Sequence, residues 1–459
     1  MLGEKVLKQA MRKISKALIA VIIAAMGLTG CLRVSADELY SLPQMSEEYL
    51  KLQAQLNAVL RQGAEFSPPT GGPNRQAVQL RDIDGCGRNE VLAFFSFPAE
   101  SAMKIYILEI NAGDYAVVEI IEGGGNAIES VRYVDMDGDG IMEIIVGWQM
   151  GTALKYFSIY TLKDFRSVLL AREEYTELAV FDLTGDGNED IIALRLPTQD
   201  TGAVAQMFAL MPDGEIVSET ARLSNGVEAI SRVLPGRLID DVPAIFVECE
   251  GRFDDMSLVT DICAFRDGSF TNILVKGPGG VSEETVRARI YSPDRIYSSD
   301  IDKDGIIKVP IPRLLMAQSE TPYYAIDWYA FNSLGYSRLL LTTYHNYFDE
   351  WFLILPNDWS GKVSVRREDT VSGERTVIFS YIADESEPYE DFLKIYRLTG
   401  DFGEERARLP GRILLMSEGT STYAFELLAP PNSYGLTFDE SIIRANFRLI
   451  YSAWLAGTI

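Results

Sequence analysis

The side chains best suited to chemistry lie between Asp135 and Glu143, where the sequence is Asp-Met-Asp-Gly-Asp-Gly-Ile-Met-Glu. Carboxylates at the first, third, fifth and ninth positions of a tight turn can point at one centre, and Ca²⁺ binds about six to eight oxygen ligands. Gly140, at the sixth position, permits the positive φ that such a turn needs. Without a cation, carboxylates this close would repel one another. The pattern predicts a calcium loop with the ligands Asp135, Asp137, Asp139 and Glu143.

Two other segments share this frame with one change each. Cys86 stands at the fifth position of Asp82–Glu90, where a soft thiol replaces a hard oxygen. Thr184 stands at the third position of Asp182–Asp190, where a neutral hydroxyl weakens cation binding. The candidate ligands are Asp82, Asp84 and Glu90 in the first segment, and Asp182, Thr184, Asp186 and Asp190 in the second.

A fourth segment keeps only the first half of the frame. Asp300, Asp302 and Asp304 are candidate calcium ligands, but the ninth position holds Lys308 instead of an acid. For all four segments the alternative is an acidic turn that its own backbone hydrogen bonds stabilise.

The segments on either side of the Asp135–Glu143 loop predict strands. Val131–Val134 before it and Ile144–Trp148 after it are rich in β-branched and aromatic residues, which favour strands. An EF-hand has helical flanks and a glutamate at position twelve. Position twelve here is Val146, so we predict a strand–calcium loop–strand unit.

The loops recur along the chain. They begin at residues 82, 135, 182 and 300, and the last interval is about twice the others. Gly236–Val247 lies near its middle and has the same strand–acidic turn–strand pattern with the ligands lost. Intervals of roughly 40–60 residues with several strands per unit are typical of propeller blades. Five repeats are compatible with a closed ring of about four to eight blades.

The motif Asp-x-Asp-x-Asp-Gly-x-x-Asp/Glu between two strands resembles the FG-GAP/VCBS repeat of integrin-α-like β-propellers, which bacterial surface proteins also carry. The resemblance covers residues 75–320. It implies that the calcium loops lie on one face of the propeller and that ligands bind on the opposite face. The loops would then be structural, and the functional surface would lie elsewhere.

Composition narrows the range of partners. The formal net charge of −24 disfavours nucleic acid, whose binding depends on cationic side chains that displace counterions. The same charge would be repelled by anionic lipid surfaces and would attract divalent cations. Much of this charge also serves to keep the chain soluble.

The N-terminus predicts a targeting segment. Residues 1–30 combine a basic region that ends at Lys16 with the apolar stretch Ala17–Gly27, which is too short to span a bilayer. Leu28-Thr29-Gly30-Cys31 resembles a bacterial lipobox, which implies cleavage before Cys31 and lipidation of its sulfur. We therefore expect the protein to be anchored by lipid to the extracytoplasmic side of the cell membrane. The alternative is an ordinary secretory signal with a chance cysteine.

Two further regions flank the repeats. Residues 31–74 predict a tether followed by a helix over Ser46–Arg61. Residues 321–459 predict a smaller α+β domain, with an extra pair of degenerate blades as the alternative. Thr437 and Glu440 predict a capping box for a final helix, whose apolar stripe is Ile443, Phe447, Ile450 and Trp454.

Catalytic motifs are weak in this sequence. His345 is the one histidine, and its aromatic surroundings favour a structural role. No Gly-x-Ser-x-Gly elbow accompanies it, and no His/Cys cluster fits zinc. The aromatic stretch 323–359 could fill a β core or form a stacking surface for a ligand, and the core is the favoured interpretation.

These observations together predict a mainly β protein that is not an enzyme. The leading hypothesis is a membrane-anchored lipoprotein whose calcium-stabilised β-propeller binds a polysaccharide or a protein. One alternative is a carbohydrate-active hydrolase or lyase on a propeller scaffold. Another is a component of a cell-envelope assembly that docks a partner through residues 321–459.

Replacing the lipidation residue tests the anchor. Cys31→Ser removes the sulfur that would carry the lipid, so we expect the protein to move from the membrane fraction into the medium. Immunoblotting of both fractions measures this. Unchanged retention of the variant in the membrane fraction would refute lipid anchoring at this residue.

Overall fold

The computed structural model describes residues 47–111, 113–152, 154–251, 257–275, 287–288, 296–315, 322–383 and 389–450. The predicted signal peptide, residues 1–30, and the predicted lipidation residue Cys31 lie outside the described residues.

The chain divides into two compact units. The first comprises residues 1–63 and 109–116, and the second comprises residues 64–108 and 117–459.

The first unit contains helix α3 (Glu47–Leu60), which confirms the helix predicted over Ser46–Arg61. The helix contacts the tip of a hairpin at residues 109–116. Lys51 Nζ donates a hydrogen bond of 2.8 Å to the Gly113 carbonyl, and the Tyr115 hydroxyl donates one of 3.1 Å to Glu48. These polar contacts attach the helix, because Val59 is its one buried residue.

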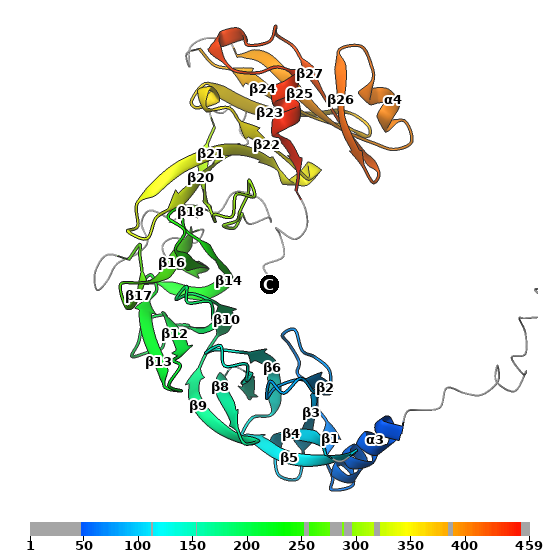
Figure 1. Ribbon diagram of the computed structural model, residues 1–459. Helices are drawn as coiled ribbons and strands as arrows, with labels where there is room; N and C mark the ends of the chain where they lie inside the picture. Colours follow the sequence, from blue (N-terminus) through cyan, green and yellow to red (C-terminus); the bar gives the residue numbers. More distant parts are fainter. Residues whose placement is uncertain are drawn as a thin grey trace, which may run out of the picture. The chain divides into compact units, whose positions relative to one another are not determined.

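The chain is mainly β, as predicted, and its described strands form six antiparallel sheets that can be followed from blue to red in Figure 1. The first sheet contains β1 (Glu65–Phe66), β2 (Val78–Arg81), β3 (Glu90–Phe97), β4 (Ala102–Asn111) and β5 (Asp114–Gly123). The second contains β6 (Ala127–Val134), β7 (Glu143–Met150), β8 (Leu154–Lys163) and β9 (Arg166–Glu174). The third contains β10 (Glu177–Phe181), β11 (Asp190–Arg195), β12 (Val204–Leu210) and β13 (Ile216–Arg222).

The later sheets are less regular. The fourth contains β14 (Val227–Arg237), β15 (Pro243–Gly251), β16 (Ser257–Arg266), β17 (Ser269–Asn272) and β18 (Arg287–Ala288). The fifth contains β19 (Val309–Leu314), β20 (Tyr324–Phe331), β21 (Ser337–Asn346), β22 (Trp351–Leu355) and β28 (Phe447–Leu449). The sixth contains β23 (Val363–Val371), β24 (Glu374–Tyr381), β25 (Glu390–Thr399), β26 (Arg412–Glu418) and β27 (Ser421–Leu427). Short helices connect some strands: α4 (Gly403–Ala407), α5 (Glu440–Asn446), η2 (Tyr347–Asp349), η3 (Asn357–Trp359) and η4 (Ser433–Gly435).

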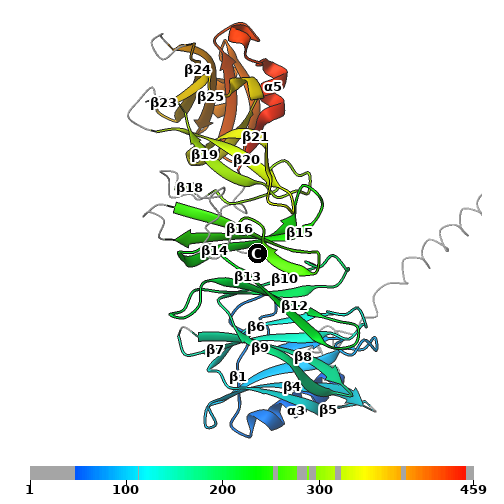
Figure 2. The same ribbon diagram turned by 90° about the vertical axis from the view of Figure 1, so that its left-hand side faces the viewer.

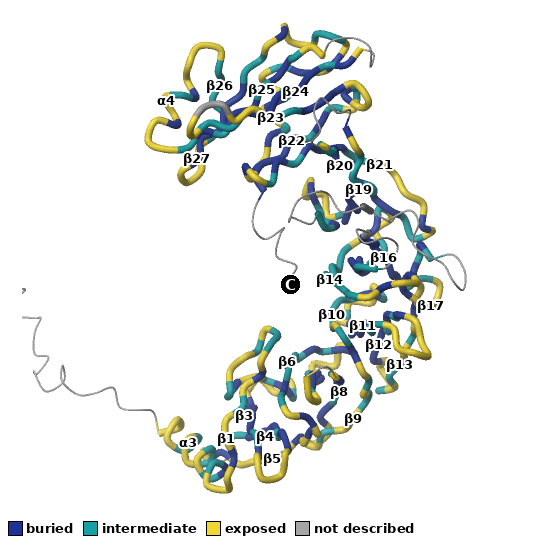
Figure 3. Tube along the Cα trace, turned by 180° about the vertical axis from the view of Figure 1, so that it is seen from behind, coloured by how far each residue is buried: buried dark blue, intermediate teal, exposed yellow. Residues whose placement is uncertain are grey.

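The hydrophobic cores lie between consecutive sheets. One core joins Phe94 of the first sheet to Trp148 of the second, and the next joins Phe157 to Phe208 of the third, with ring centroids 5.2 Å apart. Full burial of such a side chain contributes roughly 1.5–3 kcal/mol. Because both faces of the inner sheets are covered, their second strands are largely buried and rich in apolar residues, and Figure 3 shows buried strands with exposed turns between them.

The sheets follow one another along the chain, and the second and third are simple meanders. In the described segments no strand of the first sheet pairs with a strand of the last, so strand pairing does not close a ring. The mainly β prediction is thus confirmed, while the closed propeller stays a proposal.

The predicted domain boundary at residues 320/321 falls inside the fifth sheet. Strand β19 pairs with β20 across it, with Val309 opposite Tyr329. Both sides of the boundary also lie in the second compact unit. The C-terminal region contains two β-sheets and only short described helices, so it has less helix than an α+β domain was expected to have.

The predicted final helix was too long. It begins after Asp439, whose carboxylate accepts the Ile442 backbone N–H at 2.9 Å, so Asp439 and not Thr437 is the N-cap. It ends at Asn446, because Phe447 continues as β28 and pairs with Leu353 of β22. Helix α5 lies beside the sixth sheet (Figure 2), and its Ile443 belongs to the core, whereas Trp454 lies outside the described residues. No helix in the described segments is long and apolar enough to cross a membrane.

Candidate metal centres

The first three acidic loops occupy equivalent places in consecutive sheets. Each connects the first hairpin of its sheet: β2 to β3, β6 to β7, and β10 to β11. The strands predicted beside the second loop are confirmed as β6 and β7. The fourth loop is closed instead by an antiparallel bridge between Ser299 and Lys308.

The first aspartate of each loop organises the backbone of the turn. Asp135 Oδ1 accepts the Gly138 N–H at 2.7 Å, and Asp135 Oδ2 accepts the Gly140 N–H at 3.0 Å. Asp182 makes the equivalent pair of bonds to Gly185 and Gly187. Backbone hydrogen bonds thus stabilise these acidic turns, and each carboxylate oxygen still has a second lone pair for a cation.

Two loop positions have positive φ, and the sequence pattern singled out only the sixth; glycine occupies the fourth in the first three loops, and Lys303 occupies it in the fourth loop. The fourth position also has positive φ, at +71° in Gly85 and +77° in Gly138. A Cβ on Gly85 would lie 2.5 Å from the Gly140 carbonyl oxygen of the next loop. The Met142 N–H donates to the Ile83 carbonyl at 3.0 Å, so the first two loops pack directly against each other.

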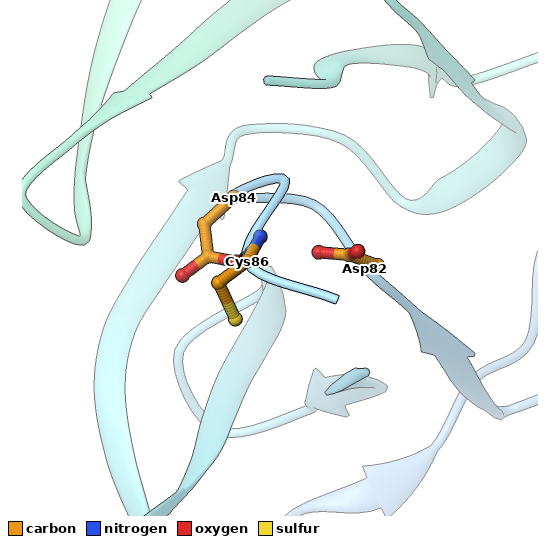
Figure 4. Close-up of side chains that lie close together, drawn as sticks. All are labelled: Asp82, Asp84 and Cys86. Carbon is orange, nitrogen blue, oxygen red and sulfur yellow. Dashed lines mark hydrogen bonds between the residues drawn. The ribbon is translucent and has the colours of Figure 1, made fainter. Parts of the chain in front are cut away.

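Three of the loops gather potential ligand atoms within 4.8 Å of one another, and in the fourth loop these belong to Asp300, Asp302 and Asp304. In the second loop these belong to Asp135, Asp137 and Glu143. In the first loop they belong to Asp82, Asp84 and Cys86, and Figure 4 shows the Asp84 carboxylate beside the Cys86 thiol. Cys86 thus joins the group in place of the predicted ligand Glu90.

The third loop and one predicted ligand of the second loop behave differently. Among the described residues, Asp182, Asp186 and Asp190 do not form such a group, and Thr184 turns its backbone N–H toward Asp190 at 2.9 Å. Asp139 likewise remains outside the second group, and its carboxylate accepts the Ile141 N–H at 2.7 Å.

The acids at the ninth position are the most buried carboxylates of their loops. Glu90, Glu143 and Asp190 are at most 3% exposed. Each accepts the backbone N–H of the second loop residue, as in the 3.0 Å bond from Met136 to Glu143. Burial raises the pKa of Glu143 to about 7 and that of Asp190 to about 6. A bound cation would favour the ionised form and so lower both pKa values.

One oxygen in the first loop tests whether the loop fits a cation. Asp82 Oδ1 is buried and accepts no hydrogen bond from any described residue. A buried acceptor normally has a partner. A hard cation bound at Asp82 and Asp84 would supply that partner, so the oxygen-rich donor set fits Ca²⁺, apart from the soft Cys86 thiol.

The fourth loop already contains a positive charge. Lys308 is fully buried, and its ammonium contacts the carboxylates of Asp302 and Asp304 and lies 3.5 Å from that of Asp300. Burial alone would lower the pKa of Lys308, but the hydrogen bonds to Asp302 and Asp304 outweigh it and raise the pKa. The three predicted ligands therefore surround the lysine ammonium. An apolar run around the residue, Ile306-Ile307-Lys308-Val309, is the one sequence signal of its burial.

The aromatic stretch 323–359 mainly forms core, as favoured. Trp328, Trp351 and Trp359 are at most 2% exposed. His345 stacks on Phe352 with ring centroids 5.0 Å apart, and both its nitrogens are buried without a hydrogen-bond partner among the described residues. Burial lowers the pKa of His345 to about 3, so the ring is neutral near neutral pH.

A scan of the chain against models of known protein families found no match, and a search among curated proteins found no similar sequence.

Replacing Lys308 by glutamate should make the fourth loop depend on calcium. Lys308→Glu removes the internal ammonium and supplies the missing ninth-position acid. Without calcium we expect a loss of about 3–5 kcal/mol, because three carboxylates lose a buried partner. Chemical denaturation with a chelator and with calcium measures both states. The same charge change at the exposed residue Lys362 is the control. Equal stability of Lys308→Glu and the native chain in chelator would contradict this account.

The buried histidine should make the protein sensitive to acid. The folded-state pKa of His345 is below its unfolded value, so the unfolded chain binds more protons as pH falls through about 6.5, and stability declines. His345→Phe keeps an aromatic ring but cannot titrate. We expect the free energy of unfolding to decline less in this variant between about pH 7 and about pH 4. The same decline in both proteins would show that His345 titrates normally.

Proposed function

We propose that this protein is a membrane-anchored, extracytoplasmic lipoprotein whose calcium-stabilised β-propeller binds a polysaccharide or a protein. The observation that carries the proposal is the repetition of acidic loops at the first hairpin of three consecutive sheets. In this proposal the sheets are propeller blades, and the resemblance of their loops to FG-GAP/VCBS repeats supports it.

Calcium would act structurally in these loops. When bound, it would neutralise crowded carboxylates and coordinate oxygens from both ends of one turn. Asp135, Asp137 and Glu143 would hold it in the second loop, and Asp82 and Asp84 in the first. Because the first two loops pack against each other, ordering one of them also supports the next. The fourth loop would not need the metal, since Lys308 supplies its charge.

A binding role suits this chain better than a catalytic one. A general base must come within hydrogen-bond reach of the proton that it removes. The chain's one histidine has both nitrogens buried, and its low pKa leaves it a poor proton acceptor. Anchoring through Cys31 would place the sheets outside the cytoplasm, where calcium and polysaccharides are both accessible.

Thermal unfolding of the full chain in detergent, with and without a calcium chelator, tests the structural role of calcium. A ligand that binds only the native state stabilises it by about 2.7 kcal/mol at a hundredfold excess over Kd. We expect chelation to lower the melting temperature, and Asp135→Ala with Asp137→Ala to remove most of that response.

Asp213→Ala with Asp267→Ala is the matched control, because both aspartates lie in exposed hairpin turns outside the loops. This double variant should respond to the chelator as the native chain does. An unchanged melting temperature on chelation, with no heat of calcium binding, would leave the loops as metal-free acidic turns and refute the calcium-stabilised propeller.

A further inference from the structure

A cavity of about 290 Å³ lies where the first strands of three consecutive sheets approach one another. Strand β6 contributes Arg132, β10 contributes residues 177–180, and β14 contributes residues 230–233 and Pro235. Each of these strands is the edge strand of its sheet. The cavity is therefore bordered by edge backbone, which can hydrogen-bond a ligand, as well as by side chains.

Two arginines bring hydrogen-bond donors to this cavity. The Arg132 guanidinium, which lines the cavity, makes no hydrogen bond or ion pair with any described residue, although it has five N–H donors. Arg232 donates to the Ser298 carbonyl at 3.1 Å and lies over the Tyr297 ring, but its Nε is buried without a partner. The Arg132 donors are therefore available to a ligand, and the buried Arg232 Nε lacks an acceptor among the described residues.

The acidic groups around the cavity balance this charge. Glu177 lines the cavity, and Glu248 lies opposite Arg232 in the register of β14 and β15. Burial raises the pKa of Glu177 against the influence of Lys155, and nearby Glu129 raises it further. Two arginines and two glutamates leave no net charge to attract an ion, and Glu177 would repel an anionic group.

Apolar side chains complete the lining. Leu178, Ile230 and Pro235 lie between the polar groups. A sugar ring presents the matching surface, since its hydroxyls both donate and accept while its C–H groups are apolar. The volume is near the lower limit of small-molecule sites, about 300 Å³, which corresponds to one ring and not to a longer segment.

We propose that this cavity binds one neutral, hydroxyl-rich sugar unit of a polysaccharide. Arg132 and Arg232 donate hydrogen bonds to its hydroxyls, and Glu177 accepts from them. This inference rests on the proposed function, of which it specifies the ligand class and the site.

Isothermal titration of the full chain in detergent, with calcium present, tests the proposal. The probes are three neutral polymers, dextran, mannan and galactan, and one acidic polymer, polygalacturonate. We expect a neutral polymer to bind, with little dependence on salt. Arg132→Gln and Glu177→Gln should each weaken that binding about tenfold, because each removes a charge-assisted hydrogen bond.

The control is Arg222→Gln. Arg222 is exposed on β13, at the opposite edge of the sheet that contains β10, so its loss should leave binding unchanged. Because Arg132 has no bonded partner among the described residues, Arg132→Gln should keep the native melting temperature. Glu177→Gln provides a second, independent probe of the same cavity.

Three results would overturn the inference, and they differ in whether they also refute polysaccharide binding. Neutral-polymer binding that neither cavity variant weakens would place the sugar site elsewhere and leave polysaccharide binding intact. Binding of polygalacturonate alone, strengthened by Glu177→Gln and abolished by salt, would identify an anionic ligand. Failure of all four polymers to bind the native chain would also remove polysaccharide binding from the proposed function.

Discussion

Crowded carboxylates require positive charge, and this requirement shapes every acidic loop of the protein. Backbone N–H groups meet part of it, as Gly138 and Gly140 do for Asp135. Burial reduces the negative charge itself, because it raises the pKa of Glu143 to about 7 and so favours the neutral carboxyl. The fourth loop uses the Lys308 ammonium instead. Lysine thus neutralises the carboxylates of one loop, and under the proposed function a bound metal would neutralise those of the others. We infer that the loops differ in how far they depend on calcium.

The order of these loops affects the stability of the sheets because the strands that they connect are buried. Each of the first three connects the strands of the first hairpin of a sheet, and both faces of the inner sheets are buried against neighbouring sheets. A disordered loop would loosen the hairpin that contains it and expose apolar strands on two faces. The direct bond between the first two loops links neighbouring sheets at the same edge. Cation binding in one loop would therefore stabilise more than its own turn.

Specificity would come from a different part of the same sheets. Among the described strands, β6, β10 and β14 are the edge strands of their sheets, and it is these strands that border the cavity. Edge strands usually need protection against unwanted pairing. Here the charged side chains Arg132, Glu177 and Arg232 provide it and at the same time offer a ligand directed hydrogen bonds. The same charged residues could thus both prevent unwanted strand pairing and recognise a ligand.

Local sequence determined the loops, their flanking strands and helix α3, because the bonds that define these elements join residues only a few positions apart. It did not reveal that the ammonium of Lys308 lies among three aspartates, since that depends on how deeply the lysine is buried. It also placed Phe447 in a helix, although pairing with Leu353 of β22, far away in the chain, makes it a strand residue. No motif marked the cavity, because its walls come from three sheets and only tertiary packing brings them together.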